Sequence, residues 1–363
     1  MYRVIQWATG RTGRAAVIGI DGHPDLELVG AWVHSEEKDG RDVGELCGLR
    51  PLGVRATRDK DALLAMPADC VCYLPARTWL ETPMETVDEL ARILRSGKNV
   101  VNAAWGALIH PATVSPAIHD KLQEACLAGG SSLYPDGIDP GHGSTGLALS
   151  ALTISQRVRS VHTYEIGSCS TFDDMAMMQV LGFGQPDPEK CVFLSPGYSS
   201  GLFGPTVALI ARAMGVALDE IVEDHQVIYA DEPIDIAIGR IPAGTISGMR
   251  FQVKGMVGGE AAVVLEHVTK TRDEDFPEVD FRGTGYRVEV DGEPGVRLDM
   301  QLTSQTGDPT EGGFVATAMS IVNAIPQVCA APPGIVTCLD LPPHPSKNLA
   351  TRFRDRRIDS LRR

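Results

Sequence analysis

The sequence predicts an α/β protein in which a doubly wound parallel sheet is followed by a second, α+β domain built on a largely antiparallel sheet. Three observations support this. Strands and helices alternate through residues 1–135, the order of a parallel sheet with helices on both faces. Strands separated by glycine-rich turns follow between residues 219 and 302, the order of antiparallel hairpins. The length of 363 residues corresponds to about two domains of ordinary size.

The first domain is expected to contain short apolar strands joined by amphipathic helices. Nearly continuous apolar runs are typical of strands buried on both faces of a parallel sheet. These runs lie at residues 2–7, 26–33, 69–74, 98–101 and 132–134. Apolar residues at helical spacing predict helices at about 10–20, 80–94 and 114–126.

The second domain is expected to begin with helices and to continue as a sheet. Helices are predicted at about 144–154, 174–181 and 203–215, and from Gly312-Gly313 to about Ile325. Strands are predicted at 158–167, 226–230, 234–240, 245–256, 260–269, 284–290 and 295–302. Gly258-Gly259 and Asp291-Gly292 are typical hairpin turns between such strands.

The composition narrows the classes of function. The net charge of −14 argues against broad nucleic-acid binding, because phosphate contacts need a basic surface. No apolar run reaches the roughly 18 residues of a membrane span, and the first residues do not form a secretory signal, so we expect a cytoplasmic protein that does not bind membranes. The 8 cysteines predict neither a disulfide framework nor a metal site.

The turn after the first strand has the pattern Ala8-x-Gly10-x-x-Gly13, one glycine short of the dinucleotide-binding fingerprint. Gly10 would let the backbone approach a pyrophosphate, and Gly13 would let the helix pack closely on the strand. Thr9, Arg11 and Thr12 complete the loop. Ala8 is tolerated in the first glycine position if its φ stays negative. The pattern predicts nucleotide binding; the alternative is a glycine-rich turn without a ligand.

The residues after the second strand should select the cofactor. An NAD site usually offers Asp or Glu there to the ribose 2′-hydroxyl. This chain has His34 and Ser35 followed by Lys38 and Arg41, which could bind a 2′-phosphate, and Arg11 could add to them. We therefore expect NADP(H). NAD stays possible, because Glu36 could hold the 2′-hydroxyl.

Several segments resemble a known family. They are Trp7-Ala-Thr-Gly-Arg-Thr-Gly-Arg14, His23-Pro-Asp-Leu-Glu-Leu-Val29, Val33-His-Ser35, Gly97-Lys-Asn-Val-Val101, Gly137-Ile-Asp-Pro-Gly141, and Val322-Asn-Ala-Ile-Pro326 with Ala331-Pro-Pro-Gly334. Together they are similar to NAD(P)-dependent proteins with a dihydrodipicolinate-reductase-type N-terminal domain. Within that family, the chain resembles the 2,4-diaminopentanoate dehydrogenase and native amine dehydrogenase branch in its actinobacterial form.

The resemblance implies a Rossmann domain at residues 1–140, an α+β substrate and dimerisation domain at 141–322, and a return to the first domain at 323–363, where a basic tail ends the chain. It also implies a cleft between the domains, a small-molecule substrate and a homodimer. In related reductases, the loops after the fourth and fifth strands touch the nicotinamide end of the cofactor. Those loops contain Pro75, Ala76, Asn102, Ala103 and Ala104.

One departure from the family affects the expected reaction. The resemblance implies a catalytic Glu just after the Lys-Asn-Val-Val strand, but residues 102–111 contain no carboxylate. His110, His142 and Asp139 are the candidates to handle the proton instead. Each also has a structural interpretation: His110 as a helix cap, His142 as a hinge residue bonded to backbone, and Asp139 as an Asx turn before proline.

Five residues are candidates for contact with the substrate: Trp105, Tyr134, Asp136, Met175 and Asn323. We expect hydride transfer between the nicotinamide and a carbonyl or imine carbon, or the corresponding alcohol or amine carbon, of a small or medium apolar substrate. The alternative is a cofactor-binding pseudo-enzyme or sensor without amine dehydrogenase activity. A pocket filled by Trp105 and Leu108 would favour that alternative.

Overall fold

The computed structural model describes residues 1–76, 82–171, 175–237, 239–272, 274–281 and 283–349. The chain divides into two compact units. Unit 1 contains Met1–Trp105, Pro116–Pro135 and the described part of Phe314–Arg363, and unit 2 contains Gly106–Ser115 and Asp136–Gly313. The division therefore falls a few residues before the expected boundaries at 140 and 322, and Gly106–Ser115 belongs to unit 2.

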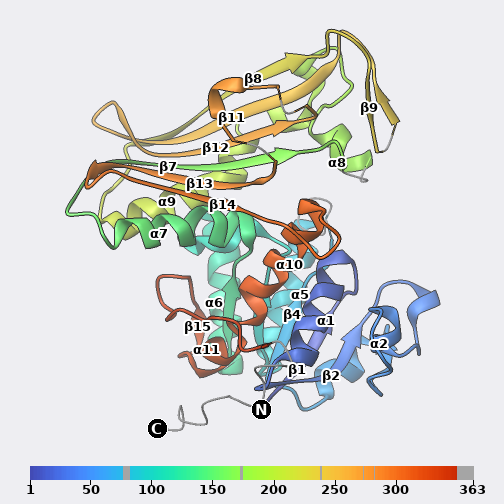
Figure 1. Cartoon of the computed structure of the whole chain (residues 1–363). Coiled ribbons are helices and arrows are strands. Elements are labelled where there is room, and N and C mark those ends of the chain that lie inside the picture. Colours follow the sequence, from blue (N-terminus) through green and yellow to red (C-terminus); the bar gives the residue numbers. More distant parts are fainter. Residues whose placement is uncertain (77–81, 172–174, 238, 273, 282, 350–363) are drawn as a thin grey trace. The chain divides into compact units, whose positions relative to one another are not determined.

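Unit 1 is built on a seven-stranded parallel sheet in the order β15-β6-β5-β4-β1-β2-β3 (Figure 1). The strands are β1 (Tyr2–Trp7), β2 (Leu26–Trp32), β3 (Ala56–Thr57), β4 (Cys70–Tyr73), β5 (Asn99–Asn102), β6 (Ser132–Pro135) and β15 (Gly334–Ile335). This strand order is that of a Rossmann fold. Strand β15 pairs with β6, so the chain returns to the first sheet near its end.

Helices on both faces of this sheet give the doubly wound class. They are α1 (Arg11–Gly22), α2 (Val43–Leu46), α3 (Lys60–Ala65), α5 (Pro83–Arg95), α6 (Pro116–Gly129), the last part of α10 (Pro309–Val322) and α11 (Ile325–Ala330). Ala16 and Ile20 of α1 pack with Val4, Ile321 and Val328 in one fully buried cluster. The side chain of Trp7 projects from the opposite face of β1. There its indole Nε1 lies 3.3 Å from the carboxylate of Glu89 of α5.

The segment Pro309–Ala330 corrects the expectation that no segment could span a membrane. Its helices are together long and apolar enough to cross one, by length and composition. In the structure, however, Ala318, Ile321, Val322 and Ile325 are fully buried in the core of unit 1. Core packing therefore accounts for the buried part of this segment, which is 33% of its most apolar window.

Unit 2 is built on a six-stranded sheet in the order β14-β13-β7-β12-β11-β8. The strands are β7 (Arg157–Ser168), β8 (Glu220–Tyr229), β11 (Ile246–Val257), β12 (Glu260–Lys270), β13 (Gly285–Glu293) and β14 (Val296–Gln301). The pairing is antiparallel except between β7 and β12, which confirms a largely antiparallel sheet. The predicted turn at Gly258-Gly259 joins β11 to β12.

Helices α7 (Leu147–Leu152) and α9 (Tyr198–Met214) pack on one face of this sheet around Val161, Phe251 and Leu265. The remaining described elements are α8 (Met175–Val180), the ribbon of β9 (Ile234–Ile236) and β10 (Gly239–Ile241), and the short turns η1 (Glu36–Lys38), η2 (Gly106–Ile109), η3 (Pro111–Thr113), η4 (Ile138–Gly146), η5 (Pro188–Lys190), η6 (Val192–Leu194) and η7 (Pro277–Val279). The predicted helix at about 144–154 is confirmed by α7 and the end of η4, because the non-helical backbone angles of η4 are at Asp139–Gly141, before the predicted start.

Candidate functional site

The turn between β1 and α1 has the geometry of an anion-binding site. Gly10 precedes the first residue of α1, its side is open, and no atom lies within 4 Å of the position where a Cβ would be. The helix begins without a side-chain cap and without an acidic residue in its first turn. Its first backbone N–H groups are therefore available to a phosphate.

Gly13 shows why the turn needs glycine. A Cβ at Gly13 would lie 2.2 Å from the carbonyl oxygen of Ala8, so only glycine allows this close approach. The same carbonyl accepts a hydrogen bond of 2.8 Å from Nε2 of buried Gln6. Ala8 corrects a prediction: its φ is +73°, not negative. An alanine here occupies the left-handed region at a cost of about 1–2 kcal/mol, in the position that glycine takes in the full fingerprint.

The residues after β2 include two polar groups suited to a 2′-phosphate. The Ser35 hydroxyl is buried and has no hydrogen-bond partner among the described residues. The Lys38 ammonium donates to the carbonyl and the hydroxyl of Thr9, each at 3.4 Å, which keeps its charge beside the turn. His34 and Arg41 are exposed, and the Arg11 guanidinium lies 5.4 Å from the centre of the Phe314 ring.

The loops after β4 and β5 lie at the same carboxyl edge of the unit 1 sheet. Asn102 is buried at the end of β5, its Oδ1 accepts from the backbone N–H of Ala104 at 2.9 Å, and its Nδ2 is buried without a partner among the described residues. Ala103 is half-buried. After β4, Pro75 is buried and Ala76 is exposed. Carboxyl ends of parallel strands are where such sheets bind ligands.

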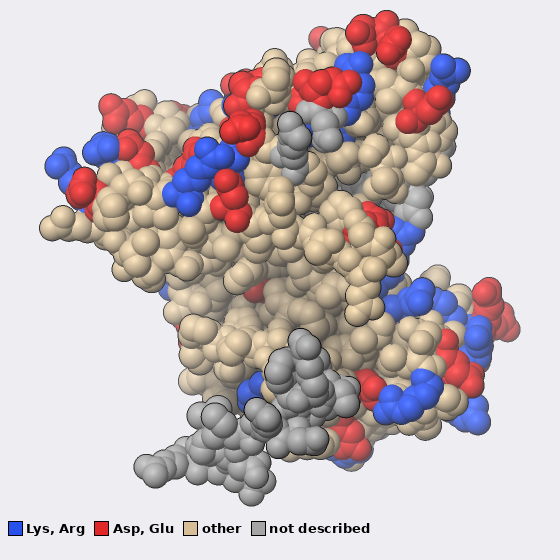
Figure 2. All heavy atoms as spheres, viewed as in Figure 1, with Lys and Arg blue, Asp and Glu red and all other residues tan. Residues whose placement is uncertain are grey.

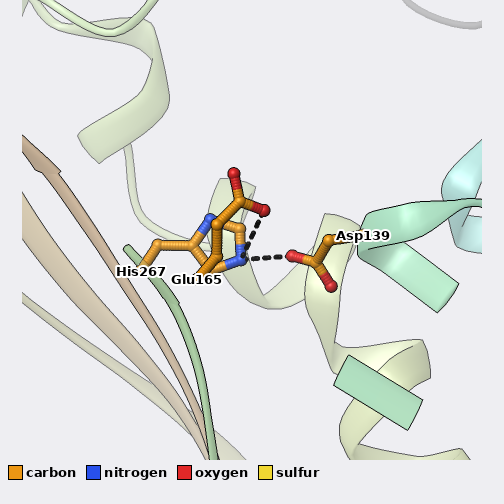
Figure 3. A group of neighbouring side chains, drawn as sticks. All are labelled: Asp139, Glu165 and His267. Atoms are coloured by element: carbon orange, nitrogen blue, oxygen red, sulfur yellow. Dashed lines mark ion pairs between the residues drawn. The ribbon is translucent and has the colours of Figure 1, made fainter. Parts of the chain in front are cut away.

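A cluster of titratable side chains lies in unit 2. Asp139 of η4, Glu165 of β7 and His267 of β12 converge as Figure 3 shows. The His267 Nε2 lies 2.6 Å from Asp139 Oδ2 and 4.0 Å from Glu165 Oε2. Asp139 is almost fully buried, with 1% of its side chain exposed, whereas Glu165 keeps 34% exposed.

The strand register brings these groups together. Glu165 pairs with His267 across the parallel pair β7–β12 and with Tyr286 across the antiparallel pair β7–β13. Direct cross-strand partners point to the same face of a sheet. The His267 ring packs against Phe203 of α9 and Phe251 of β11, with ring centres 4.3 and 4.7 Å away, and the two phenyl rings also contact each other. The cluster is therefore fixed by the sheet and by α9.

The three groups shift one another's proton affinity. Burial raises the pKa of Glu165 to about 8, and the negative charge of Asp139 acts in the same direction. Burial would also raise the pKa of Asp139, but the positive charge of His267 outweighs it and the pKa lies below its ordinary value. Burial lowers the pKa of His267, but the charges of Glu165 and Asp139 outweigh it and the pKa is raised. The result is a charged Asp139–His267 pair beside a carboxyl that stays protonated near neutral pH.

The donor set of this cluster also occurs around metal ions, because the three ligand atoms lie within 4.8 Å of one another. The geometry favours a direct ion pair. Two ligands of a tetrahedral zinc ion, each about 2.0–2.2 Å from the metal, are about 3.3–3.6 Å apart. The 2.6 Å between His267 Nε2 and Asp139 Oδ2 is shorter, as in a contact without an ion between the two atoms.

Of the three predicted proton-handling residues, only Asp139 belongs to this cluster. His110 is buried, its Nδ1 has no partner among the described residues, and burial together with the charge of Arg212 lowers its pKa. Arg212 follows Phe203 by nine residues on α9, about 13 Å along the helix. His142 is exposed, and a Cβ at Gly146 would lie 2.7 Å from its ring nitrogen Nδ1.

The contacts of His110, His142 and Asp139 also bear on the structural role expected for each of them. His110 is the N-cap residue of η3, and its carbonyl accepts from the backbone N–H of Thr113 at 2.9 Å, but its side chain makes no capping hydrogen bond. The backbone N–H of His142 donates to the carbonyl of Gly137 at 2.8 Å. Asp139 makes an ion pair with His267, which an Asx turn alone would not require.

The predicted substrate residues fall in different places. Tyr134 is fully buried in the core of unit 1, with its ring edge toward His344. Trp105 is also buried, in unit 1. Asp136 lies in unit 2, where a Cβ at Gly141 would lie 2.5 Å from its carboxylate. Asn323 is half-buried after α10, and the side chain of Met175 lies outside the described residues.

Sequence reasoning missed His267 and Tyr286 as site residues. His267 follows Val263 and Leu265 at alternate positions of a predicted strand, which identifies it as a polar group on an apolar face. This alternation of side chains along the strand is the sequence signal that could have identified His267. Its pairing with Glu165 joins residues about 100 positions apart and has no local signature.

Comparison with known proteins identifies the family. Residues 4–126 match the family described as dihydrodipicolinate reductase, N-terminus, and residues 146–356 match the 2,4-diaminopentanoate dehydrogenase C-terminal domain. An amine dehydrogenase from Streptomyces virginiae is 34% identical over 95% of this chain and 98% of its own length. A 2,4-diaminopentanoate dehydrogenase from Acetoanaerobium sticklandii is 26% identical over 70% of this chain and 69% of its own length.

The solved structure of an amine dehydrogenase from Mycobacterium smegmatis has the same fold, with a TM-score of 0.75 and 18% identity over 96% of this chain and 98% of that one. The fold, the two family matches and the full-length relative agree with one another. The chain therefore belongs to the amine dehydrogenase and 2,4-diaminopentanoate dehydrogenase family of NAD(P)-dependent oxidoreductases.

Proposed function

We propose that this enzyme transfers hydride between NADP(H) and the carbon of an amine, imine or carbonyl group in a small, largely apolar substrate. The observation that carries the proposal is the open turn at the start of α1 with Ser35 and Lys38 beside it. It combines a pyrophosphate site with two groups suited to a 2′-phosphate.

The residues of unit 1 fit this cofactor. The N–H groups at the start of α1 would hold the pyrophosphate, because Gly10 leaves the approach open. The unpartnered Ser35 hydroxyl and the Lys38 ammonium would hold the 2′-phosphate. The unpartnered Nδ2 of Asn102 would bind the carboxamide of the nicotinamide. When bound, the nicotinamide ring gives or accepts the hydride, and the protein must supply the proton chemistry.

Amine chemistry is favoured over alcohol chemistry by two observations. The full-length relative at 34% identity is an amine dehydrogenase, and unit 2 holds two carboxylates on one imidazole, a set of groups that suits a cationic substrate. His110 and His142 are weaker candidates for the proton, because neither is part of this set. Trp105 and Asp136 remain candidates for contact with the substrate.

We also propose a homodimer that acts on small molecules in the cytoplasm. Acidic and basic side chains are intermingled on the face of the molecule seen in Figure 2, as is usual for a protein that does not bind nucleic acid. Sedimentation of the purified protein would test the homodimer, and a monomer at micromolar concentration would contradict it.

The test has two stages. NADPH and NADH are first titrated into the purified protein while nicotinamide fluorescence is followed; we expect at least tenfold tighter binding of NADPH. Primary alkylamines with NADP⁺, and ketones with ammonia and NADPH, are then screened by absorbance of the reduced nicotinamide. Binding of neither cofactor would overturn the proposal. Cofactor binding without turnover of any amine, alcohol or ketone would favour a cofactor-binding sensor instead.

A further inference from the structure

We infer that Glu165, supported by Asp139 and His267, binds the ammonium group of the substrate and exchanges its proton, in place of a carboxylate on residues 102–111. The inference rests on the proposed function and deepens it, because it names the residue that handles the proton of the amine substrate. Glu165 is the catalytic residue in this assignment, and Asp139 and His267 are positioning residues.

Exposure decides which member of the cluster meets the substrate. Asp139 and His267 have 1% and 10% of their side chains exposed, whereas Glu165 has 34%. Asp139 and His267 are also in direct contact at 2.6 Å, so each already has an ionic partner. Glu165 lies 4.0 Å from the imidazole and is the carboxyl group that remains accessible.

Stability alone does not explain the cluster. Val161, Leu265 and Val288 lie on the same face of the sheet and are almost fully buried, so this face is an apolar core beside the cluster. Replacing a buried ion pair by packed apolar residues is often neutral or stabilising, since burying the charges is costly. Three titratable groups kept in such a place therefore indicate a chemical role.

The charge of the cluster changes when a cation binds. The groups facing Glu165 are Asp139 from η4, His267 from β12, Tyr286 from β13 and Cys169 just after β7. Near neutral pH, the charges of Asp139 and His267 cancel, and Glu165 is protonated. An arriving ammonium favours the ionised form of Glu165, which then gives up its proton. The cluster is thus neutral when empty and carries one compensating negative charge when an ammonium is bound.

The ionised Glu165 then acts as a base in amine oxidation. It takes a proton from the bound ammonium, and the nitrogen lone pair so formed becomes the second bond to carbon as the C–H bond breaks and its electron pair leaves as hydride. Glu165 releases the first proton to solvent, and water then adds to the resulting iminium carbon and gives a proton to Glu165. The carbinolamine loses its C–N bond and releases ammonia, which takes that proton from Glu165 and leaves as ammonium. In total, the ammonium substrate, NADP⁺ and water give the carbonyl product, ammonium, NADPH and one proton.

In the reverse reaction, reductive amination, a carboxyl group that is protonated at neutral pH can act as the acid. Loss of hydroxide from the carbinolamine is slow unless an acid protonates the leaving oxygen. Glu165 with a pKa of about 8 holds that proton at pH 7. The same carboxyl then faces the cationic product as an anion.

Isothermal titration calorimetry can measure how many protons the enzyme releases when an ammonium binds. NADPH-loaded enzyme, which cannot oxidise an amine, is titrated with cyclohexylammonium chloride at pH 7 in two buffers that differ in ionisation enthalpy and are not primary amines. We expect release of most of one proton per bound ammonium at pH 7 and a much smaller release at pH 9, because the pKa of Glu165 is raised to about 8.

Substitutions of Glu165 test whether the released proton comes from this carboxyl group. Glu165→Gln should abolish the release at pH 7 and lower the rate of amine oxidation by about 100-fold or more. Glu165→Asp keeps a carboxyl group and should retain proton release, which separates loss of the group from damage to the fold. The matched control is Glu289→Gln, a carboxyl of β13 that contacts Tyr164, the neighbour of Glu165 on the opposite face of β7. It should behave like the unsubstituted enzyme.

Five outcomes are distinguishable. Release that disappears only in Glu165→Gln supports the inference. Release that persists in Glu165→Gln, or ammonium binding without release in the unsubstituted enzyme, overturns it. Intact NADPH binding with no ammonium binding also overturns it but leaves the cofactor function standing. Failure to bind NADPH overturns the proposed function itself.

Discussion

Glu165 and His267 are direct partners in the parallel strand pair β7–β12, and their side chains meet on one face of the sheet with 4.0 Å between Glu165 Oε2 and His267 Nε2. Tyr286 of β13 is the direct partner of Glu165 in the antiparallel pair β7–β13. Because register fixes which side chains share a face, the proton-handling group depends on the pairing of β7 with β12 and β13, two strands that follow it by about 90 residues or more. Four predictions follow from this arrangement and from the turn at the start of α1.

The rate of reductive amination should fall as pH rises above about 8. The reductive direction needs protonated Glu165, and burial raises the pKa of this carboxyl to about 8. Above that value, the rate should drop about tenfold per pH unit, whereas amine oxidation should rise through the same range. Initial rates from pH 6 to 10 check this, with Glu165→Gln expected to lose the transition near pH 8. A profile shared by both enzymes would contradict the assignment.

The stability of the folded protein should also depend on Glu165. Its pKa is about 8 in the folded state and near 4.5 when unfolded, so the folded state holds the proton more tightly. This contribution is fully present below pH 4.5 and is lost as pH rises through 8. Between pH 5 and pH 9, the unsubstituted enzyme should lose roughly 2 kcal/mol relative to Glu165→Gln, a figure reduced for solvent screening of this partly exposed group.

Urea unfolding at pH 5 and pH 9 measures this difference. Glu289→Gln serves as the control, since its carboxyl group lies on the other face of the sheet and should show no such relative change. Equal pH dependence for the unsubstituted enzyme and Glu165→Gln would show that this carboxyl is not protonated in the folded state at neutral pH.

Substitution of Gly13 should damage cofactor binding. A Cβ at this position would lie 2.2 Å from the Ala8 carbonyl oxygen, so the turn must shift. We expect Gly13→Ala to weaken NADPH binding at least tenfold and to lower the free energy of unfolding by about 1–3 kcal/mol. Fluorescence titration and thermal unfolding measure the two effects. Gly201→Ala on α9 is the control, because nothing lies within 4 Å of its added Cβ; similar effects from both variants would contradict the argument.

Removal of the Lys38 charge should change cofactor preference. The ammonium is held beside the turn by Thr9, where it can neutralise a 2′-phosphate. Lys38→Ala should weaken NADPH binding about tenfold and leave NADH binding within twofold, because only NADPH carries that phosphate. Competition titrations of both cofactors test this, with the exposed Lys190→Ala in unit 2 as the charge-matched control. Equal loss for both cofactors would assign Lys38 a role in the turn alone.

The sequence by itself determined most of the fold. Apolar runs and helical periodicity located β1, β2, β4 and α5 to within a few residues, because these signals are local. The turn at Gly10 and Gly13 was also readable, since a close backbone approach requires glycine wherever the chain folds back this tightly. The positive φ of Ala8 could not be predicted, because nothing in the local sequence indicates that an alanine will adopt a positive φ.

The tertiary structure decided the proton-handling site. Asp139 could be selected from its place in the chain, but its partner His267 comes from a strand about 130 residues away, and Glu165 from a third element. Strand order and register arise from packing of the whole unit, so no segment encodes them alone. The proton affinities of these groups depend in turn on burial and on one another's charges. They exist only once the strands have paired, which is why the residue types were visible in the sequence and their joint chemistry was not.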